Sequence, residues 1–211
     1  MNDITISNNM IEQLRSKIKR ILTPKRFEHT LGVENAAVKM GTELQYNEIT
    51  TLKAAALLHD ITKEYSFEKQ LKICEEFGII LRRDELECPQ VIHSITAAAI
   101  IPANYSEFAS KEVISAVRWH TTGRRDMTLS DKIICLADYI EDGRNHASCI
   151  NLRRDFWNEI LACKNQAEKV NCLNKALKTY FENTVIYLNH NQKTINLDTI
   201  EALKYITSAE L

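Results

Sequence analysis

The sequence has few of the residues that form turns. It contains only five glycines and three prolines in 211 residues, which argues against a turn-rich β architecture such as a sandwich or barrel. Hydrophobic residues make up 45% of the chain and charged residues 26%, a balance typical of globular proteins. We therefore predict an all-α fold that forms a single domain over residues 1–211.

The sequence also has no stretch typical of a targeting signal or a membrane span. The first segment, Met1 to Asn9, is polar, and no apolar run approaches the roughly 18 residues that a spanning helix needs. The formal net charge is only −1, which gives no reason to expect binding to nucleic acid or to a membrane surface. We expect a cytoplasmic protein that binds neither.

The cysteines lack any C-x-x-C pair. The six that are present are scattered, which excludes a zinc knuckle and a thioredoxin-like motif. We expect all six to be free thiols. Cys74 and Cys135 lie in apolar helical stretches, where cysteine commonly acts as a small core residue.

Apolar residues recur at helical spacing along most of the chain. Thr23, Asn47, Ser66 and Thr128 are the expected N-caps. Residues 82–89, 121–126 and 142–144 are predicted to be irregular. The expected helices cover residues 10–22, 24–44, 48–63, 66–78, 91–101, 106–120 and 128–140, followed by helices within 152–188 and a last one over 198–209.

One apolar helical stretch ends at adjacent histidine and aspartate residues. It runs from Ala54 to Lys63 and contains the pair His59-Asp60. Neighbouring residues point about 100° apart on a helix, so one metal ion over the last turn can be reached by both. Because such a pair is common by chance, it needs partners elsewhere in the chain.

Further histidines and aspartates interrupt apolar helical stretches or end them. One such residue is usually a hydrogen-bonded core residue, but several together favour a shared site. A carboxylate in an apolar face is costly unless it is paired or binds a cation, and mixed imidazole and carboxylate ligands suit iron, manganese, cobalt, nickel or zinc. The residues concerned are His29, His59, Asp60, His93, His120 and Asp138.

The spacing of His29, His59-Asp60 and Asp138 resembles the H…HD…D signature of the HD-domain metal phosphohydrolases. The surrounding motifs are similar to those of the YqeK group of bacterial HD proteins, the symmetrical diadenosine tetraphosphate hydrolases. The resemblance covers roughly residues 25–154, and one departure is Asp142, where the group has proline. The motifs are RFEHT from Arg26, LHDITK from Leu58, IHS from Ile92, HTTG from His120 and ADYIE from Ala137, with Arg144.

The resemblance implies an HD-type helical bundle with a core of about residues 24–154 and additional C-terminal helices, about 152–211, packed on it. It also implies one or two transition-metal ions, iron first, with manganese, cobalt or another divalent ion as alternatives. The implied metal ligands are His29, His59, Asp60 and Asp138. Asp60 is expected to bridge to a second ion.

The resemblance also implies roles in phosphoryl chemistry. Lys63 and Asp60 are the expected catalytic residues, with a metal-activated water attacking a phosphoanhydride. Arg124 and Arg153 are expected to be solvated surface charges. The expected substrate-binding residues are His93, His120, Thr121, Thr122, Gly123, Arg144 and Arg26, with His93 and His120 as alternative ligands of a second metal.

The activity that this resemblance implies is symmetrical cleavage of diadenosine tetraphosphate into two molecules of ADP. The partner would be this small nucleotide, and a homodimer through an apolar helix face is a further expectation. Three alternatives remain open from the sequence: an HD-type phosphatase of nucleoside monophosphates, a non-catalytic nucleotide-binding regulatory module, and a purely structural bundle.

Overall fold

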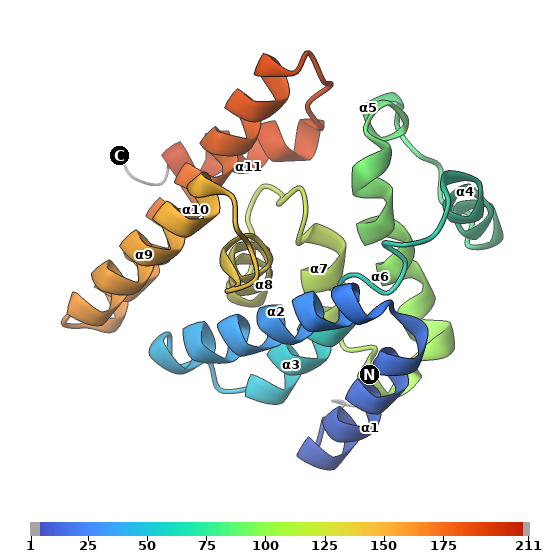
Figure 1. Ribbon diagram of the computed structural model, residues 1–211, viewed down its shortest axis with the longest axis horizontal. Coiled ribbons are helices and arrows are strands. Elements are labelled where there is room, and N and C mark those ends of the chain that lie inside the picture. The colour runs from blue at the N-terminus through green and yellow to red at the C-terminus, as the bar shows by residue number, and fades with distance from the viewer. Residues whose placement is uncertain (1–4, 209–211) are drawn as a thin grey trace.

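The protein is built from helices joined by short turns, which confirms the predicted all-α fold (Figure 1). The computed structural model describes residues 5–208, and within that range it contains no β-strand. Residues 1–4 of the predicted polar start and Ala209, the predicted end of the last helix, lie outside the described residues. No helix in the described part of the chain is long and apolar enough to cross a membrane.

Eleven α-helices and two short 3-10 segments make up the described residues. The helices are α1 (Asn8–Ile21), α2 (Pro24–Glu43), α3 (Ile49–Leu58), α4 (Phe67–Glu76), α5 (Arg83–Glu87), α6 (Ile92–Asn104), α7 (Lys111–Trp119), α8 (Leu129–Ile140), α9 (Ala147–Ala162), α10 (Gln166–His190) and α11 (Leu197–Ser208), with η1 (Pro89–Val91) and η2 (Ser106–Phe108) as the 3-10 segments.

Three of the four predicted N-caps are confirmed. The hydroxyls of Thr23, Ser66 and Thr128 each accept a hydrogen bond from a backbone N–H in the first turn of α2, α4 and α8. The prediction for Asn47 is wrong. Glu48 precedes α3 instead, and its carboxylate accepts a hydrogen bond from the Thr51 hydroxyl at 3.1 Å rather than capping the backbone.

Helix α3 ends at Leu58, earlier than the predicted Lys63. Beyond it the backbone forms successive tight turns, with Ile61 N–H donating to Leu58 O at 3.4 Å and Lys63 N–H donating to Asp60 O at 3.0 Å. His59 and Asp60 therefore lie in a turn directly after the helix. This turn carries the two side chains into the interior, where both are almost fully buried.

Several other boundaries differ from the prediction, among them the start of α9 at Ala147 rather than near residue 152. Residues 82–89, expected to be irregular, contain α5, because the Glu85 carboxylate accepts a hydrogen bond from Arg82 N–H at 2.8 Å and starts a helical turn. Helix α6 continues past Pro102 to Asn104, although proline removes one backbone hydrogen bond within the helix. The predicted helix over 106–120 is divided into η2 and α7, which Ser110 caps.

Helices α2, α3, α7 and α8 form the centre of the molecule. Helix α3 packs against α1, α2, α7 and α8, and α2 also packs against α8. The small side chains of Ala54, Ala55 and Ala56 are fully buried, which allows the neighbouring helices to approach closely. This arrangement brings the end of α3 against the middle of the bundle.

The C-terminal helices gather around α8. Helix α10 packs against α8, α9 and α11, and these helices lie together on one side of the view, with α4 and α5 on the other (Figure 1). Phe156 and Phe181 are fully buried there and belong to one continuous hydrophobic core. All six cysteines are free, and the buried Cys74 and Cys135 are small core residues as predicted.

Candidate metal centre

Five separate segments bring six ionisable side chains to one point in the bundle. Helix α2 supplies a histidine from its second turn, and α8 supplies an aspartate from its last turn. The turn after α3 supplies a histidine and an aspartate, α6 supplies a histidine at its start, and α7 is followed directly by another. These residues are His29, Asp138, His59, Asp60, His93 and His120, the six that the sequence singled out.

Asp60 lies between two pairs of imidazoles. Its Oδ2 atom is 3.4 Å from His59 Nε2 and 3.6 Å from His29 Nε2, and its Oδ1 atom is 3.2 Å from His93 Nε2 and 3.7 Å from His120 Nε2. The two oxygens of one carboxylate thus face two different donor sets. If a cation were bound beside either pair of imidazoles, Asp60 would offer it one oxygen.

Two groups of side chains have donor atoms close enough to hold one ion. In each group the three donor atoms lie within 4.8 Å of one another. One group is His29, His59 and Asp138, and the other is His59, Asp60 and His120. His59 belongs to both, and His93 Nε2 lies 3.0 Å from His120 Nε2 at the edge of the second.

Each of the four imidazoles is held through its Nδ1 atom. Three donate to the backbone carbonyl three residues earlier, whereas His29 contacts the Oε1 atom of Glu141 at 3.1 Å. In a neutral imidazole held through Nδ1 in this way, Nε2 carries the lone pair, the arrangement found for metal-binding histidines. The backbone bonds are His59 to Ala56 O at 2.6 Å, His93 to Gln90 O at 2.8 Å and His120 to Val117 O at 2.7 Å.

The buried nitrogen atoms test whether these residues fit a metal. The Nε2 atoms of His29 and His59 are buried and make no hydrogen bond of good geometry. His29 Nε2 lies 3.0 Å from Asp138 Oδ1, and His59 Nε2 lies 3.4 Å from Asp60 Oδ2. A buried polar atom without a well-aligned partner is costly. Imidazole and carboxylate donors suit a divalent transition metal, so the site fits one.

The carboxylates in the site are held in their charged form. Burial opposes ionisation of Asp60, but the imidazoles around it keep its pKa well below the ordinary value. Burial opposes ionisation of Asp138 as well, and the Arg144 guanidinium and His29 keep that pKa low. The cluster therefore contains two ionised carboxylates, which can serve as anionic ligands for a cation.

The surroundings shift the pKa values of His29 and His93 in opposite directions. Burial opposes protonation of His29, yet the carboxylates of Asp138 and Glu141 outweigh it and raise its pKa to about 9. Burial and the nearby Lys63 ammonium lower the pKa of His93 to about 4. His93 is thus a neutral donor at physiological pH.

Three cationic side chains surround the acidic centre. Arg26 Nη1 lies 2.7 Å from Asp60 Oδ2, and Arg144 Nη2 lies 2.5 Å from Asp138 Oδ1. Lys63 Nζ lies 3.2 Å from His93 Nδ1, and burial lowers the pKa of this lysine against the pull of Asp60 and Asp138. Positive charges next to a metal site are typical of sites that bind phosphate.

A groove opens next to this centre. It has a volume of about 660 Å³ and lies between the first turns of α2 and the segment after α8. Arg26, His29 and Arg144 line it, together with Lys25 and Gly143. Its size is in the range of small-molecule sites, so the cluster is connected to a cavity large enough for part of a nucleotide.

In the loop after α7, Thr121 contacts the centre, whereas Thr122 and Gly123 make other contacts. The Thr121 hydroxyl is 3.2 Å from His93 Nε2. Thr122 is buried, and its hydroxyl donates to Gly123 O at 2.9 Å. Gly123 has φ +64 and packs against Phe181 of α10. These contacts give Thr122 and Gly123 a structural role in the fold. A role for them in substrate binding stays a prediction.

Replacing Gly123 with alanine is expected to lower the free energy of unfolding by about 2–4 kcal/mol. A side chain is strained at φ +64, and the added Cβ would lie 2.5 Å from Phe181 Cζ. Thermal and urea unfolding followed by circular dichroism measure the change. Gly78→Ala is the matched control, because Gly78 has φ +65 but open space around it. Equal losses in the two variants would contradict the packing role of Gly123.

Two residues that sequence reasoning left out of the site support it. Glu141 holds His29, and Arg153 Nη2 donates to Arg144 O at 3.0 Å while its Nη1 donates to Glu141 O at 2.5 Å. The prediction that Arg153 is a solvated surface charge is therefore wrong, because carbonyls after α8 bind its guanidinium. Arg124 is also not free, since its Nε donates to the buried Asp131 carboxylate at 3.1 Å.

Asp142, at the position where the resemblance led us to expect proline, lies in a closed turn after α8. Arg144 N–H donates to Glu141 O at 3.0 Å and closes the turn. The Asp142 side chain is fully exposed. Arg144 Nε donates to Asp138 O at 2.9 Å, so this arginine reaches the centre without the proline.

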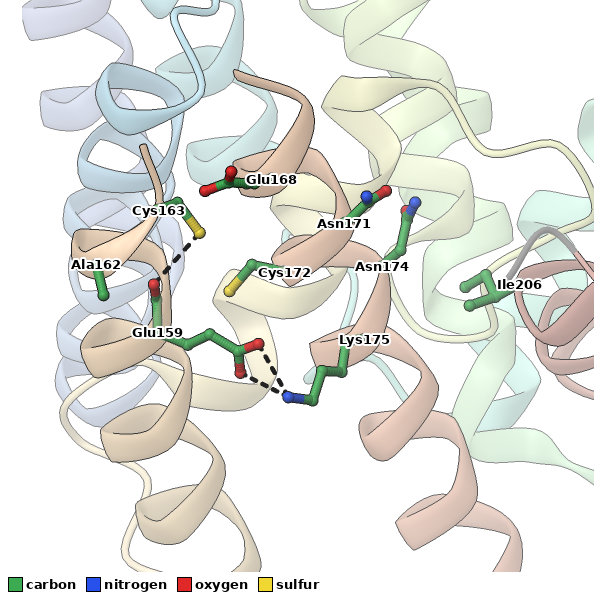
Figure 2. Close-up of a pocket in the computed structure, with 9 residues that line it drawn as sticks. All are labelled: Glu159, Ala162, Cys163, Glu168, Asn171, Cys172, Asn174, Lys175 and Ile206. Atoms are coloured by element: carbon green, nitrogen blue, oxygen red, sulfur yellow. Dashed lines mark hydrogen bonds and ion pairs between the residues drawn. The ribbon is translucent and has the colours of Figure 1, made fainter. Parts of the chain in front are cut away.

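A second hollow, of about 630 Å³, lies between α9 and α10 (Figure 2). Glu159 and Lys175 form an ion pair of 2.9 Å across it, and Cys163 and Cys172 line it. Burial raises the pKa of the Cys172 thiol to about 12, which keeps it neutral. None of the described residues that line it is a histidine or an aspartate.

Comparison with known protein families defines the class. The model of the HD domain family matches residues 26–143, a range that includes every residue of the histidine and aspartate cluster. The chain belongs to the HD domain family, as the sequence motifs predicted.

Individual relatives extend over nearly the whole chain. The symmetrical bis(5'-nucleosyl)-tetraphosphatase of Staphylococcus aureus is 30% identical, with 92% of this chain and 93% of that protein covered. The protein of the same name from Bacillus subtilis is 27% identical, with 93% and 97% covered. The crystal structure of a predicted HD superfamily hydrolase from Clostridium acetobutylicum, described as involved in NAD metabolism, has a TM-score of 0.80 and 28% identity, with 94% and 97% covered.

Proposed function

We propose that this protein is a metal-dependent hydrolase that cleaves diadenosine tetraphosphate symmetrically into two molecules of ADP. The observation that carries the proposal is the position of Asp60, whose two oxygens face two pairs of inward-pointing imidazoles. The near full-length similarity to symmetrical bis(5'-nucleosyl)-tetraphosphatases supports the choice of substrate.

The proposed metal ligands are His29, His59, Asp60 and Asp138, with His93 and His120 available for a second ion. When bound, a divalent metal supplies Lewis acidity that polarises a phosphoryl group and makes water a nucleophile near neutral pH. Iron is our first choice, and manganese and cobalt suit the same donors. The unbonded Nε2 atoms of His29 and His59 support the assignment.

The cationic residues around the centre would bind the substrate's phosphates. Arg26 and Arg144 line the same groove as His29, and a guanidinium can donate to two phosphate oxygens at once. Lys63 places an ammonium next to His93, where it would stabilise the negative charge that develops on the phosphoryl oxygens. The Thr121 hydroxyl, which lies 3.2 Å from His93 Nε2, would be a further hydrogen-bond donor to phosphate.

Phosphate binding would release the carboxylates from their arginine partners. Arg26 contacts Asp60 and Arg144 contacts Asp138, so each guanidinium can exchange a carboxylate for a phosphate oxygen while the carboxylate turns toward a cation. His93, with its lowered pKa, stays neutral during this exchange and can accept a hydrogen bond at Nε2. These residues thereby neutralise the substrate's charge within the groove.

Chromatography of the reaction products tests the proposed function. The protein is incubated with diadenosine tetraphosphate and Mn²⁺, and the nucleotides are separated by anion exchange. We expect ADP as the nucleotide product, two molecules for each substrate molecule consumed. Formation of ATP and AMP would contradict symmetrical cleavage.

Assays with nucleoside monophosphates and a measurement of ADP binding separate two of the alternatives left open by the sequence. Phosphate release from nucleoside monophosphates, without cleavage of the dinucleotide, would indicate an HD-type phosphatase. Binding of ADP without turnover in metal-loaded protein would indicate a regulatory module. A cytoplasmic location, a homodimer and the single-domain organisation belong to the proposal as predictions from the sequence.

A further inference from the structure

His29 is held differently from the other three histidines of the centre. His59, His93 and His120 are fixed by backbone carbonyls of their own segments, three residues earlier. His29 is fixed by a side chain, Glu141, which is 112 residues away in the sequence. The direction of the His29 ring therefore depends on one residue in another part of the fold.

Both oxygens of the Glu141 carboxylate are engaged. Oε1 lies 3.1 Å from His29 Nδ1, and Oε2 accepts a hydrogen bond from Gly143 N–H at 2.6 Å. Glu141 is only 4% exposed, and its pKa is lowered by His29 and the Gly143 amide against the effect of burial. A charged, buried carboxylate with two partners has little freedom to move.

Two glycines make room for this carboxylate. A Cβ at Gly32, within α2, would lie 2.3 Å from Glu141 Oε2, and a Cβ at Gly143 would lie 2.9 Å from the same atom. Glycine within a helix is less favourable than alanine, so Gly32 lowers the stability of α2 in exchange for close approach of Glu141. The backbone of Glu141 is held in turn by Arg153.

We propose that Glu141 is a positioning residue that holds His29 with Nε2 directed at the metal, in a pocket made by Gly32 and Gly143. The proposal rests on the metal site of the proposed function. Glu141 contacts the ring through Nδ1, on the side away from the ligand atom, and its Oε1 atom also lies 3.9 Å from Arg144 Nε. Carboxylates placed in this way orient a histidine and strengthen its binding to the metal.

Titration of the full-length protein with Mn²⁺, followed by the electron paramagnetic resonance of the free ion, tests the proposal. Glu141→Ala is expected to weaken Mn²⁺ binding roughly 10- to 100-fold. Glu34→Ala is the matched control, because Glu34 is also 4% exposed and also engages two partner atoms, those of Arg15, but lies outside the centre. Glu34→Ala should bind Mn²⁺ as the unmodified protein does.

Two further variants distinguish positioning from a general effect on folding. Glu141→Gln keeps an oxygen that accepts from His29 but meets Gly143 N–H with its amide nitrogen, so its affinity should lie between those of the unmodified protein and Glu141→Ala. Gly32→Ala leaves every hydrogen-bonding group in place and displaces the Glu141 carboxylate. It should weaken binding even though alanine favours the helix, and it should add no loss to Glu141→Ala in the double variant.

Unchanged Mn²⁺ affinity in Glu141→Ala, or an equal loss in Glu34→Ala, would overturn the positioning role. If Glu141→Ala does not fold, Gly32→Ala decides the question in the same titration. Weaker Mn²⁺ binding in these variants, together with no cleavage of diadenosine tetraphosphate by the unmodified protein, would support the role of Glu141 and contradict the proposed function. The two failures are thus distinguishable.

Discussion

Replacing Asp60 with alanine is expected to abolish both metal binding and hydrolysis, with activity lower by at least about 10³-fold. Asp60 is the one residue of the cluster that lies within 4 Å of all four imidazoles. Its removal takes away a donor from the group formed by His59, Asp60 and His120, and it also leaves Arg26 Nη1 without its carboxylate partner. Elemental analysis of the purified variant and chromatography of its products measure the two losses.

Asp155→Ala provides the control for this variant. Asp155 is exposed on α9 and pairs only with its neighbour Arg154 among the contacts described, so its replacement should change neither metal content nor turnover. Asp60→Asn extends the test, because it keeps the shape of the side chain and removes its charge. Full activity in Asp60→Ala with normal metal content would be incompatible with the role given to this carboxylate.

Replacing Lys63 with methionine is expected to lower kcat by about 10²–10³-fold while the metal stays bound. Methionine preserves much of the buried stem and removes the ammonium, which lies 3.2–3.3 Å from the two ring nitrogens of His93. Lys63 is a cation and is not among the proposed metal ligands. Its loss should therefore lower the turnover rate and leave metal binding unchanged. Steady-state kinetics and elemental analysis of the same preparation separate the two effects.

Lys132→Met is the matched control for Lys63→Met. Lys132 is also partly buried, burial also lowers its pKa, and its ammonium donates to Asn174 Oδ1 at 2.8 Å, away from the centre. We expect normal kcat in this variant. Loss of bound metal from Lys63→Met, or a kcat equal to that of the unmodified protein, would refute a direct role of the ammonium in the reaction.

The helices could be predicted from the sequence wherever local chemistry sets their limits. Thr23 and Pro24 start α2 because a hydroxyl caps the first turn and proline suits the position after it. Thr128 starts α8 in the same manner. The apolar spacing between such signals also predicted the all-α class, since periodicity along the chain depends on which face is buried.

Other boundaries depend on contacts that local sequence does not contain. Helix α3 ends at Leu58 rather than Lys63 because the following backbone forms tight turns that carry His59 and Asp60 into the cluster. Both residues can adopt helical conformation, so periodicity alone extends the helix. Pro102 was expected to end α6, but the helix tolerates it within its last turn.

The six residues of the cluster could be singled out because histidine and aspartate in apolar stretches are unusual. Their geometry could not be predicted, since it depends on the packing of α2, α3, α6, α7 and α8. Glu141 belongs to a motif that was noted, but its contact with His29 joins residues 112 positions apart. No sequence pattern indicated that Arg153 supports the site, because an arginine on an amphipathic helix is usually exposed.

Metal removal and replacement in one preparation tests the central claim most directly. The protein is stripped with a chelator, its metal content is measured, and Mn²⁺ or Fe²⁺ is added back in steps while cleavage of diadenosine tetraphosphate is followed. We predict no cleavage by the metal-free protein, and formation of ADP that rises with bound metal until one or two ions are bound per chain. Full cleavage by metal-free protein would contradict the claim that the cluster around Asp60 works as a metal centre.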